Sequence, residues 1–305
     1  MKSPETDYET IVIGGGPAGL SAGLWLARYR RKVIILDSGK SRNDQTWAVH
    51  GFPGVVDPPP HELRRVLIQQ AKEAGAEWRG ADVDHVAGKK NNFSVHLEDG
   101  ASLTARRVLL AYGRRDNLPD VPGARELYGS SVYHCPDCDG PTVTGKRVAV
   151  FGWTRGTAVH ALYMLTWAES VVMLTHGNEL KIKKKARDVL AKYDVAIRTE
   201  RVLSLKSVNG CLMAAELEGA PAIPIDYLFF NLGSPLATDI ASRLGCKRDK
   251  EKNLVIDRAH QTSVPGVFAA GDIAGPPYLA VTAAAQGVTA AIGMHRSMLP
   301  PDMEL

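Results

Sequence analysis

Short apolar runs alternate with helical patterns along this chain. The apolar run at residues 11–13 leads directly into GGGPAG at 14–19, and a helical spacing of apolar residues then leads to a second predicted strand at 33–37. This order of strand, glycine turn, helix and strand predicts a βαβ unit. The same order returns at 147–152, near 157–168 and at 171–174. Two such units in one chain predict a duplicated α/β architecture.

The segments around these units complete the predicted organisation. Strands are expected at 93–97, 108–111, 227–230 and 267–270, and helices near 61–74 and from about 279 to 294. Residues 113–122 are rich in Arg, Asp, Asn and Pro, which is typical of a linker between domains. A second linker, through which the chain returns to the first domain, is expected near 233–246. We therefore predict two Rossmann-like, three-layer ββα nucleotide-binding domains, the second inserted in the first. Residues 1–115 and 244–305 would form one domain, and residues 116–243 the other.

Composition narrows the class of protein. The 305 residues are 45% hydrophobic and 23% charged, with a formal net charge of +4, which is ordinary for a soluble globular protein. No apolar run approaches the roughly 18 residues that would span a bilayer. The polar, acidic N-terminal stretch is unlike a secretory signal, so we expect a cytoplasmic protein. Basic residues do not interleave with aromatic ones, which argues against nucleic-acid binding.

The first glycine turn predicts a dinucleotide site. In GGGPAG, Gly14 allows the tight turn, Gly16 lets a pyrophosphate approach the backbone, and Gly19 lets helix and strand pack closely. Asp37 closes the second strand, where an acidic side chain can accept hydrogen bonds from a ribose. A lone glycine motif is weak, but here strand, loop, helix, strand and terminal acid all occur in order.

The stretch HCPDCDG at 134–140 places two of the four cysteines three positions apart. A zinc site would need two further ligands, and His134 is the one obvious candidate. A static disulfide is disfavoured in a reducing compartment. A redox pair explains more, because a Cys-x-x-Cys pair near a helix N-terminus favours the thiolate form of one sulfur while the other resolves mixed disulfides. Asp139 could carry the proton that a leaving thiolate needs.

Several stretches of the chain carry a family resemblance. TSVPGVFAAGD at 262–272 resembles the motif that brings an Asp to the flavin in the FAD-dependent pyridine nucleotide-disulfide oxidoreductases. CPDCDG followed by TGKRVAVFG is similar to the low-molecular-weight thioredoxin reductases, as are residues 51–77 and 280–291. The resemblance covers nearly the whole chain. It implies FAD on residues 1–115 and 244–305, and an NAD(P)H-binding-like domain that carries the cysteine pair at 116–243.

The resemblance also implies residue roles. Cys138 would be the sulfur nearest the flavin, Cys135 the one that attacks a partner disulfide, and Asp139 the acid/base residue. A thioredoxin-like protein or a small dithiol or disulfide would be the partner, and the family is homodimeric. The implied cofactor contacts are Gly14, Gly16, Pro17, Ala18, Gly19, Asp37, Gly113, Gly271, Asp272 and Ala280.

The second glycine turn departs from the family pattern. GWTRGT at 152–157 places Thr154 and Thr157 where a glycine and a small residue are expected, and a β-carbon at Thr154 would obstruct a pyrophosphate. Residues 175–178 lack an arginine pair that could grip a 2′-phosphate. We therefore expect NADPH to be used inefficiently. The alternative is that the turn shifts, Gly156 serves, and NADH binds weakly.

The flavin side departs from the family as well. The family's Arg-Gln before the last helix is replaced by Tyr278-Leu279, and an expected Asn is Gly51. Either Tyr278 or Trp47 could then stack on the flavin ring. The alternative is that both are ordinary packed aromatic residues.

The leading hypothesis is a thioredoxin reductase-like flavoenzyme that exchanges two electrons between FAD, Cys135/Cys138 and a disulfide or dithiol. Without NADPH, a ferredoxin-like donor could supply electrons and dock on the basic run at 181–187, although that run is more simply a solvated helix face. A dithiol oxidase that passes electrons to oxygen is the alternative enzyme. A flavin-binding scaffold or redox sensor without turnover is the alternative of another class, and the intact CPDCD argues against it.

Overall fold

The computed structural model describes residues 6–303, and the chain divides into two compact units. The first unit contains the residues up to Asp44, Gly51–Arg115 and the residues from Pro235 onward. The second contains Gln45–His50 and Asp116–Ser234. The second unit is thus inserted in the first, as the sequence predicts.

The predicted domain ranges differ from these units in two places. The second break follows Ser234 rather than residue 243, because helix α6 (Ile240–Arg243) buries Ile240 and Ala241 in the core of the first unit. Residues Gln45–His50 join the second unit although the sequence on both sides of them belongs to the first. A β-carbon on Gly129 would collide with the carbonyl oxygen of Gln45, so this segment crosses the second unit in direct backbone contact.

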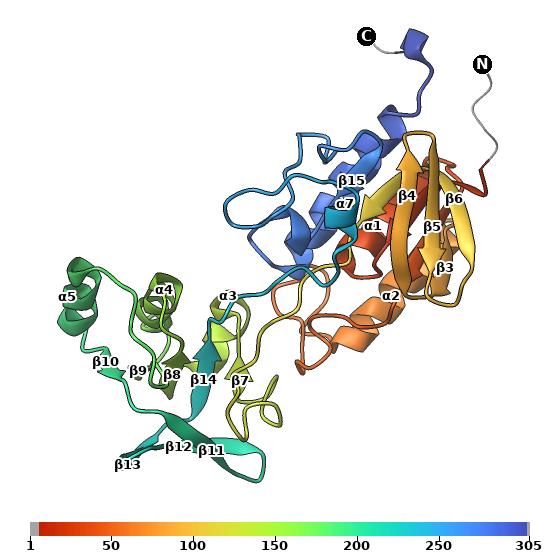
Figure 1. The fold of residues 1–305 in the computed structure, drawn as a ribbon. Helices are drawn as coiled ribbons and strands as arrows, with labels where there is room; N and C mark the ends of the chain where they lie inside the picture. The colour runs from red at the N-terminus through yellow and green to blue at the C-terminus, as the bar shows by residue number, and fades with distance from the viewer. Residues whose placement is uncertain (1–5, 304–305) are drawn as a thin grey trace. The chain divides into compact units, whose positions relative to one another are not determined.

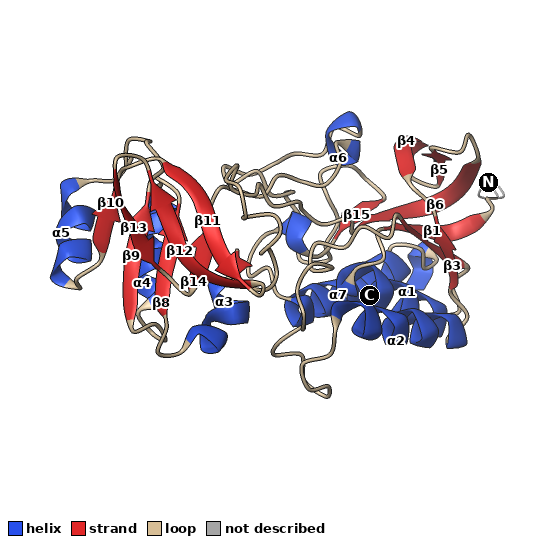
Figure 2. Ribbon diagram, turned by 90° about the horizontal axis from the view of Figure 1, so that it is seen from below, coloured by secondary structure: helices blue, strands red, loops and turns tan. Residues whose placement is uncertain are grey.

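The first unit is a parallel sheet with an antiparallel extension. Its seven strands lie in the order β3-β2-β1-β6-β5-β4, and β15 pairs with the end of β6. Helices α1, α2 and α7 lie together on one face of this sheet (Figures 1 and 2). The elements are β1 (Tyr8–Ile13), α1 (Pro17–Arg28), β2 (Val33–Asp37), α2 (Pro60–Glu73), β3 (Glu77–Gly80), β4 (Val83–Lys89), β5 (Asn92–Leu97), β6 (Ser102–Leu110), α6, β15 (Val267–Ala269), the 3₁₀ turn η2 (Asp272–Ala274), α7 (Ala280–Arg296) and η3 (Pro301–Met303).

Strand β1 is buried on both faces, which explains its continuous apolar run. Ile11 and Ile13 pack into the core on one side of the sheet, and Val12 packs into the core beneath the helices. On the helical side, a β-carbon on Gly287 of α7 would collide with the carbonyl oxygen of Ala18 in α1. Small residues therefore let the two helices pack in backbone contact at the glycine turn.

The second unit has three layers. Its five-stranded parallel sheet has the order β10-β9-β8-β14-β7, and a three-stranded antiparallel sheet has the order β11-β12-β13. The elements are β7 (Val132–Tyr133), α3 (Pro136–Asp139), η1 (Gly140–Val143), β8 (Arg147–Phe151), α4 (Arg155–Met164), β9 (Ser170–Leu174), α5 (Lys184–Lys192), β10 (Ala196–Arg198), β11 (Val202–Val208), β12 (Cys211–Leu217), β13 (Ala220–Pro224) and β14 (Tyr227–Phe230).

Successive residues of the central strands divide between the two cores of this unit. Phe151 and Phe230 pack toward the three-stranded sheet, whereas Val150 and Phe229 pack toward α4 and α5. These layers confirm the predicted α/β class with two Rossmann-like units. Within residues 6–303, no helix is both long and apolar enough to cross a membrane.

Candidate active site

The first glycine turn joins β1 to α1, and its glycines have different neighbours. Gly14 has φ +112°, and a β-carbon there would collide with the carbonyl of Ala111, the residue directly after β6. A β-carbon on Gly19 would collide with the carbonyl oxygen of Gly14. Gly16, by contrast, has nothing within 4 Å of the position of a β-carbon beyond its chain neighbours. The fold requires Gly14 and Gly19, whereas Gly16 faces open space where a pyrophosphate could approach the backbone.

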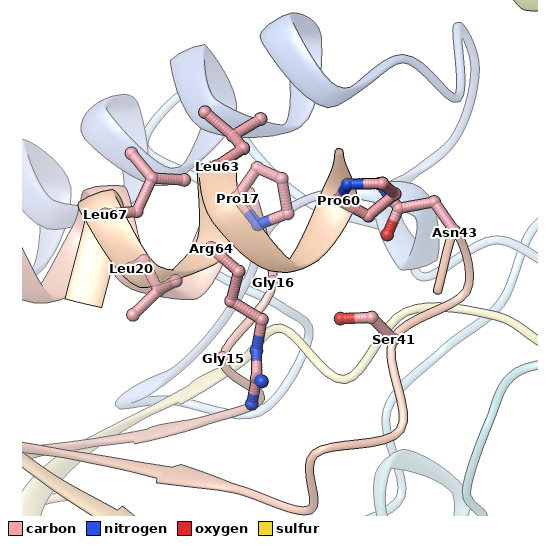
Figure 3. Close-up of a pocket in the computed structure, with 10 residues that line it drawn as sticks. All are labelled: Gly15, Gly16, Pro17, Leu20, Ser41, Asn43, Pro60, Leu63, Arg64 and Leu67. Atoms are coloured by element: carbon pink, nitrogen blue, oxygen red, sulfur yellow. The ribbon is translucent and has the colours of Figure 1, made fainter. Parts of the chain in front are cut away.

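A pocket lies in front of the N-terminus of α1 (Figure 3). Gly16 is the N-cap residue, and no side chain caps the helix, so the first-turn N–H groups are available to an anion. Arg64 extends from α2 toward Gly15, and the hydroxyl of Ser41 points into the same space (Figure 3). The lining residues are Gly15, Gly16, Pro17, Leu20, Ser41, Asn43, Pro60, Leu63, Arg64 and Leu67.

Asp37 closes β2 beside this pocket. Its Oδ1 accepts a hydrogen bond from the N–H of Gly39 at 3.1 Å, and its Oδ2 forms an ion pair with Arg64. A β-carbon on Gly15 would collide with the same carboxylate. The sequence indicates Asp37 but not Arg64, because Arg64 and Arg65 are equivalent charges on an amphipathic helix until the tertiary structure selects one of them.

The end of the stretch at 262–272 meets the first turn inside the same unit. Gly271 has φ +80°, and its N–H donates a hydrogen bond to Oε1 of Gln286 in α7 at 2.8 Å. A β-carbon on Gly271 would lie 3.0 Å from the β-carbon of Ala18. Gly113, with φ +71°, follows β6, and Ala280 is the first residue of α7. The fold thus gathers sequence-predicted residues from both ends of the chain into one unit.

Asp272 is held by two arginines. Oδ2 of Asp272 forms an ion pair with Nη1 of Arg42 at 2.8 Å, and its carbonyl oxygen accepts a hydrogen bond from Nε of Arg114 at 2.8 Å. The same two guanidinium groups lie 5.5 and 5.2 Å from the ring centre of Tyr278. The hydroxyl of Tyr278 donates to Oδ1 of Asn253 at 3.3 Å. Tyr278 therefore has protein partners for both its ring and its hydroxyl.

The cysteine pair forms a disulfide at the start of α3. Cys135 is the N-cap residue of this short helix, and the N–H of Cys138 donates a hydrogen bond to Sγ of Cys135 at 3.1 Å. Both cysteines are partly exposed. This confirms a disulfide-forming pair. No group of three or more potential metal-ligating side chains occurs within residues 6–303.

Helix α4 supports the segment that carries the disulfide. The hydroxyl of Tyr163 donates to Oδ1 of Asp137 at 2.8 Å. A β-carbon on Gly140 would lie 2.5 Å from the ring of Trp167, so the indole packs directly on the chain after the pair. These contacts hold α3 on the body of the second unit.

Asp139 is a buried acid next to Cys138. Its side chain is 3% exposed, and burial raises its pKa to about 6, while the nearby charge of His50 opposes the rise. A carboxyl group with such a pKa can both donate and accept a proton near neutral pH. The residue after Cys138 in the chain is therefore a buried carboxylic acid with a raised pKa.

The first unit thus has an uncapped helix N-terminus at α1 and an acid, Asp37, at the end of β2. The second unit has the Cys135–Cys138 disulfide followed by the buried Asp139. The model of the pyridine nucleotide-disulphide oxidoreductase family matches residues 8–287. The chain belongs to this family. Within it, the protein is a thioredoxin reductase-like flavin disulfide oxidoreductase, and FAD is the cofactor that the family implies.

Three relatives of this oxidoreductase illustrate the similarity. Thioredoxin reductase from Listeria monocytogenes is 27% identical, with 90% of this chain and 88% of the relative covered. Thioredoxin reductase tcpT from Claviceps purpurea is 31% identical, with 87% and 86% covered. The crystal structure of HlmI superposes with a TM-score of 0.90 at 33% identity, and 95% and 92% of the two chains are covered.

At the second glycine turn of the oxidoreductase, side chains of the turn itself cap the N-terminus of α4. Thr154 is the N-cap residue of α4, and its Oγ1 accepts a hydrogen bond from the N–H of Thr157 at 3.3 Å. The N–H of Thr154 donates in return to Oγ1 of Thr157 at 3.3 Å. This reciprocal capping box consumes two backbone donors that a phosphate would need. At the corresponding place in the first unit, Gly16 leaves the donors of α1 uncapped.

The surroundings of this turn are also filled. A β-carbon on Gly152 would lie 2.5 Å from Oγ1 of Thr157, and one on Gly156 would lie 3.0 Å from Nδ2 of Asn231. After β9, Nδ1 of His176 accepts a hydrogen bond from the N–H of Val202 at 3.0 Å. Protein groups therefore contact one another closely at this turn, and His176 in the loop after β9 hydrogen-bonds the backbone at the start of β11.

Proposed function

We propose that this oxidoreductase transfers electrons between FAD, the Cys135–Cys138 disulfide and a dithiol or disulfide partner, and that it uses NADPH inefficiently. The observation that carries the proposal is the contrast between its two helix N-termini. Gly16 leaves α1 uncapped beside a pocket, whereas Thr154 and Thr157 cap α4. The backbone N–H donors at the start of α1 are therefore available to a pyrophosphate. At the start of α4, threonine side chains already accept hydrogen bonds from two such donors.

The residues of the first unit fit FAD. Gly14, Gly16 and Gly19 shape the turn for its pyrophosphate, Asp37 would accept from a ribose hydroxyl, and Asp272 would face the ribityl side. When bound, FAD supplies the two-electron redox chemistry. A thioredoxin-type protein or a small dithiol is the proposed partner, in a homodimeric enzyme of the cytoplasm.

The residues of the second unit would carry out the thiol–disulfide exchange. Cys135 would exchange with the partner sulfur, and the N–H of Cys138 already points at Sγ of Cys135, where it would stabilise a thiolate. Cys138 would then leave as a thiolate and take a proton from the carboxyl group of Asp139. Burial keeps that carboxyl group protonated below about pH 6.

Anaerobic mixing with NADPH and with NADH tests the cofactor proposal. We expect the flavin absorbance to bleach at least about 10²-fold more slowly with either nucleotide than with dithiothreitol, because α4 offers few free donors to a pyrophosphate. Dithiothreitol is the positive control for a functional disulfide. Bleaching by NADPH as fast as by dithiothreitol would contradict the proposal.

The same assay separates the other hypotheses. Reduced ferredoxin that bleaches the flavin would identify a protein donor, for which Lys181, Lys183 and the exposed lysines at the start of α5 offer a basic surface. Oxygen consumption with a dithiol would identify a dithiol oxidase. If no reductant that reaches the disulfide bleaches the flavin, the protein is a flavin-binding scaffold or sensor.

Asp139→Asn tests the proton carrier. We expect dithiol-linked flavin reduction to slow by about 10²-fold, because the leaving thiolate loses its acid. In the unsubstituted enzyme, we divide the rate of flavin reduction by the concentration of the dithiol's thiolate form. This normalised rate should fall as the pH rises through about 6, where Asp139 loses its proton. The variant should lack this fall. Stopped-flow rates from about pH 5 to 8 measure both effects, and an unchanged profile would exclude Asp139 as the acid.

The same substitution should change the pH dependence of stability. The pKa of Asp139 is above its ordinary value of 3.8 in the folded protein, so the folded state binds the proton more tightly than the unfolded state. Its stabilising contribution is complete below about pH 4 and is lost as the pH rises through about 6. Asp139→Asn should not show this loss in thermal unfolding measured across the same range.

A further inference from the structure

We propose that Arg64 is a cofactor-binding residue whose guanidinium group binds the pyrophosphate of an adenosine diphosphate moiety in front of α1. The inference deepens the proposed function, because FAD carries this moiety and the proposal rests on FAD being the cofactor of the first unit. It gives a ligand to a side chain that the sequence does not distinguish from its neighbour Arg65.

Helix α2 carries Arg64 to the pocket beside its packed face. Leu63 is 5% exposed, and Leu67, one turn further along, packs against the helical core of the first unit. Both leucines line the pocket together with Arg64, whereas Arg65 is exposed and lies outside the lining. Figure 3 shows the guanidinium group of Arg64 beside Gly15. The packing of α2 therefore fixes which of the two arginines enters the pocket.

Arg64 gives this pocket a positive charge. Among the ten described residues that line the pocket, Arg64 is the only one with a charged side chain. The pocket lies in front of the uncapped N-terminus of α1, which adds the positive end of a helix dipole. Two independent features, a cation and a helix N-terminus, thus favour an anion at the same place.

The hydrogen bonds of Arg64 are incomplete within the protein. Its Nη2 is paired with Oδ2 of Asp37, but its Nε is buried and has no hydrogen-bond partner within residues 6–303. A buried donor without an acceptor costs free energy, and a phosphate oxygen would supply the acceptor. The planar guanidinium fork suits phosphate because it can donate two parallel hydrogen bonds. Arg64 therefore has both the charge and a spare donor for a pyrophosphate.

The ion pair with Asp37 lets one pocket serve two parts of the moiety. Asp37 would accept from the ribose, as proposed above, but its buried negative charge would repel the adjacent pyrophosphate. Arg64 offsets that charge. Asp44 also interacts electrostatically with Arg64, but its side chain is exposed and water screens its charge. Arg64 therefore compensates mainly the buried carboxylate of Asp37.

Arg64→Met tests this role, because methionine keeps most of the length of the side chain and removes the charge. In the apoprotein, we expect ADP and FAD to bind at least about tenfold more weakly, and the affinity for adenosine, which has no phosphate, to change less than about twofold. Calorimetric titrations measure the three affinities. Arg65→Met is the matched control on the same helix and should leave all three unchanged. Equal weakening of ADP and adenosine, or no weakening of ADP, would overturn the proposal.

An Asp37→Asn background separates phosphate binding from compensation of the carboxylate. Asparagine removes the buried charge that Arg64→Met alone would leave unpaired, so the double variant avoids that source of instability, and thermal unfolding of the apoprotein checks the fold. If Arg64 binds phosphate, Arg64→Met should still weaken ADP by at least about tenfold in this background. Disappearance of the loss would show that Arg64 only neutralises Asp37, and the proposal would fail.

The same titrations distinguish this proposal from the proposed function. ADP binding that depends on Arg64, in a protein that does not bind FAD, would leave the role of Arg64 intact and refute FAD as the cofactor. FAD binding that is equally tight with and without Arg64 would leave the proposed function intact and refute the role of Arg64.

Discussion

Cys138→Ser should abolish the reduction of the flavin by dithiols, with a loss of at least about 10³-fold, as removal of a reacting nucleophile usually causes. The physical reason is that a hydroxyl group cannot form or break the bond that stores the two electrons. Anaerobic titration with dithiothreitol, followed by flavin absorbance, measures the loss.

A second serine substitution provides the matched control for this result. Cys211 is a free, exposed cysteine on β12, and Cys211→Ser should leave the rate unchanged. Unchanged kinetics in Cys138→Ser would refute the enzymatic hypothesis and favour a flavin-binding scaffold. Both variants should keep the flavin, because neither residue belongs to the first unit.

Gly16→Val should weaken the binding of FAD by at least about tenfold and leave the fold intact, which corresponds to about 1.4 kcal/mol of binding free energy. Gly16 has φ −79° and ψ −179°, an extended conformation that valine adopts readily, and no protein atom crowds its β-carbon position. The added side chain would instead occupy the space of the pyrophosphate. Fluorescence titration of the apoprotein with FAD measures the affinity, and thermal unfolding without FAD measures the fold.

Two further valine substitutions make this prediction specific. Thr154→Val changes the corresponding N-cap of the second unit and should leave FAD affinity as it is, although it removes the side-chain cap of α4. Gly19→Val should destabilise the apoprotein, because its β-carbon would collide with the carbonyl oxygen of Gly14. If Gly16→Val binds FAD as tightly as the unsubstituted protein does, the pyrophosphate does not approach the turn at Gly16.

Local pattern predicted the framework of both units well. The buried strands β2 and β14 cover the predicted ranges 33–37 and 227–230, and α2 covers residues 60–73 where the amphipathic spacing predicts 61–74. These elements are recognisable because burial of both faces, or of one helical stripe, constrains successive residues. The three-stranded sheet β11–β13 was not among the predicted elements. Buried positions do not alternate regularly along β11, and β13 has no buried position, so the period-two signal of a strand is weak.

The second glycine turn shows how the two levels of information combine. Sequence indicates that Thr154 places a β-carbon where a pyrophosphate should approach the backbone. The structure adds that the hydroxyl oxygen of each threonine accepts a hydrogen bond from the backbone N–H of the other. A capping box is visible in a sequence only as two hydroxyl residues at the right spacing, whereas its hydrogen bonds depend on where the helix begins.

By itself, the sequence determined the two βαβ units, the glycine turn that suits a dinucleotide, and the cysteine pair with an acid beside it. These features are local, because each depends on residues a few positions apart. Only the tertiary structure decided that Arg64 pairs with Asp37, that α6 belongs to the first unit, and that Gln45–His50 belongs to the second. Such pairings join residues far apart in the chain, and the physical reason that they form is burial. A carboxylate removed from water must find a partner, and the fold alone decides which side chain is within reach.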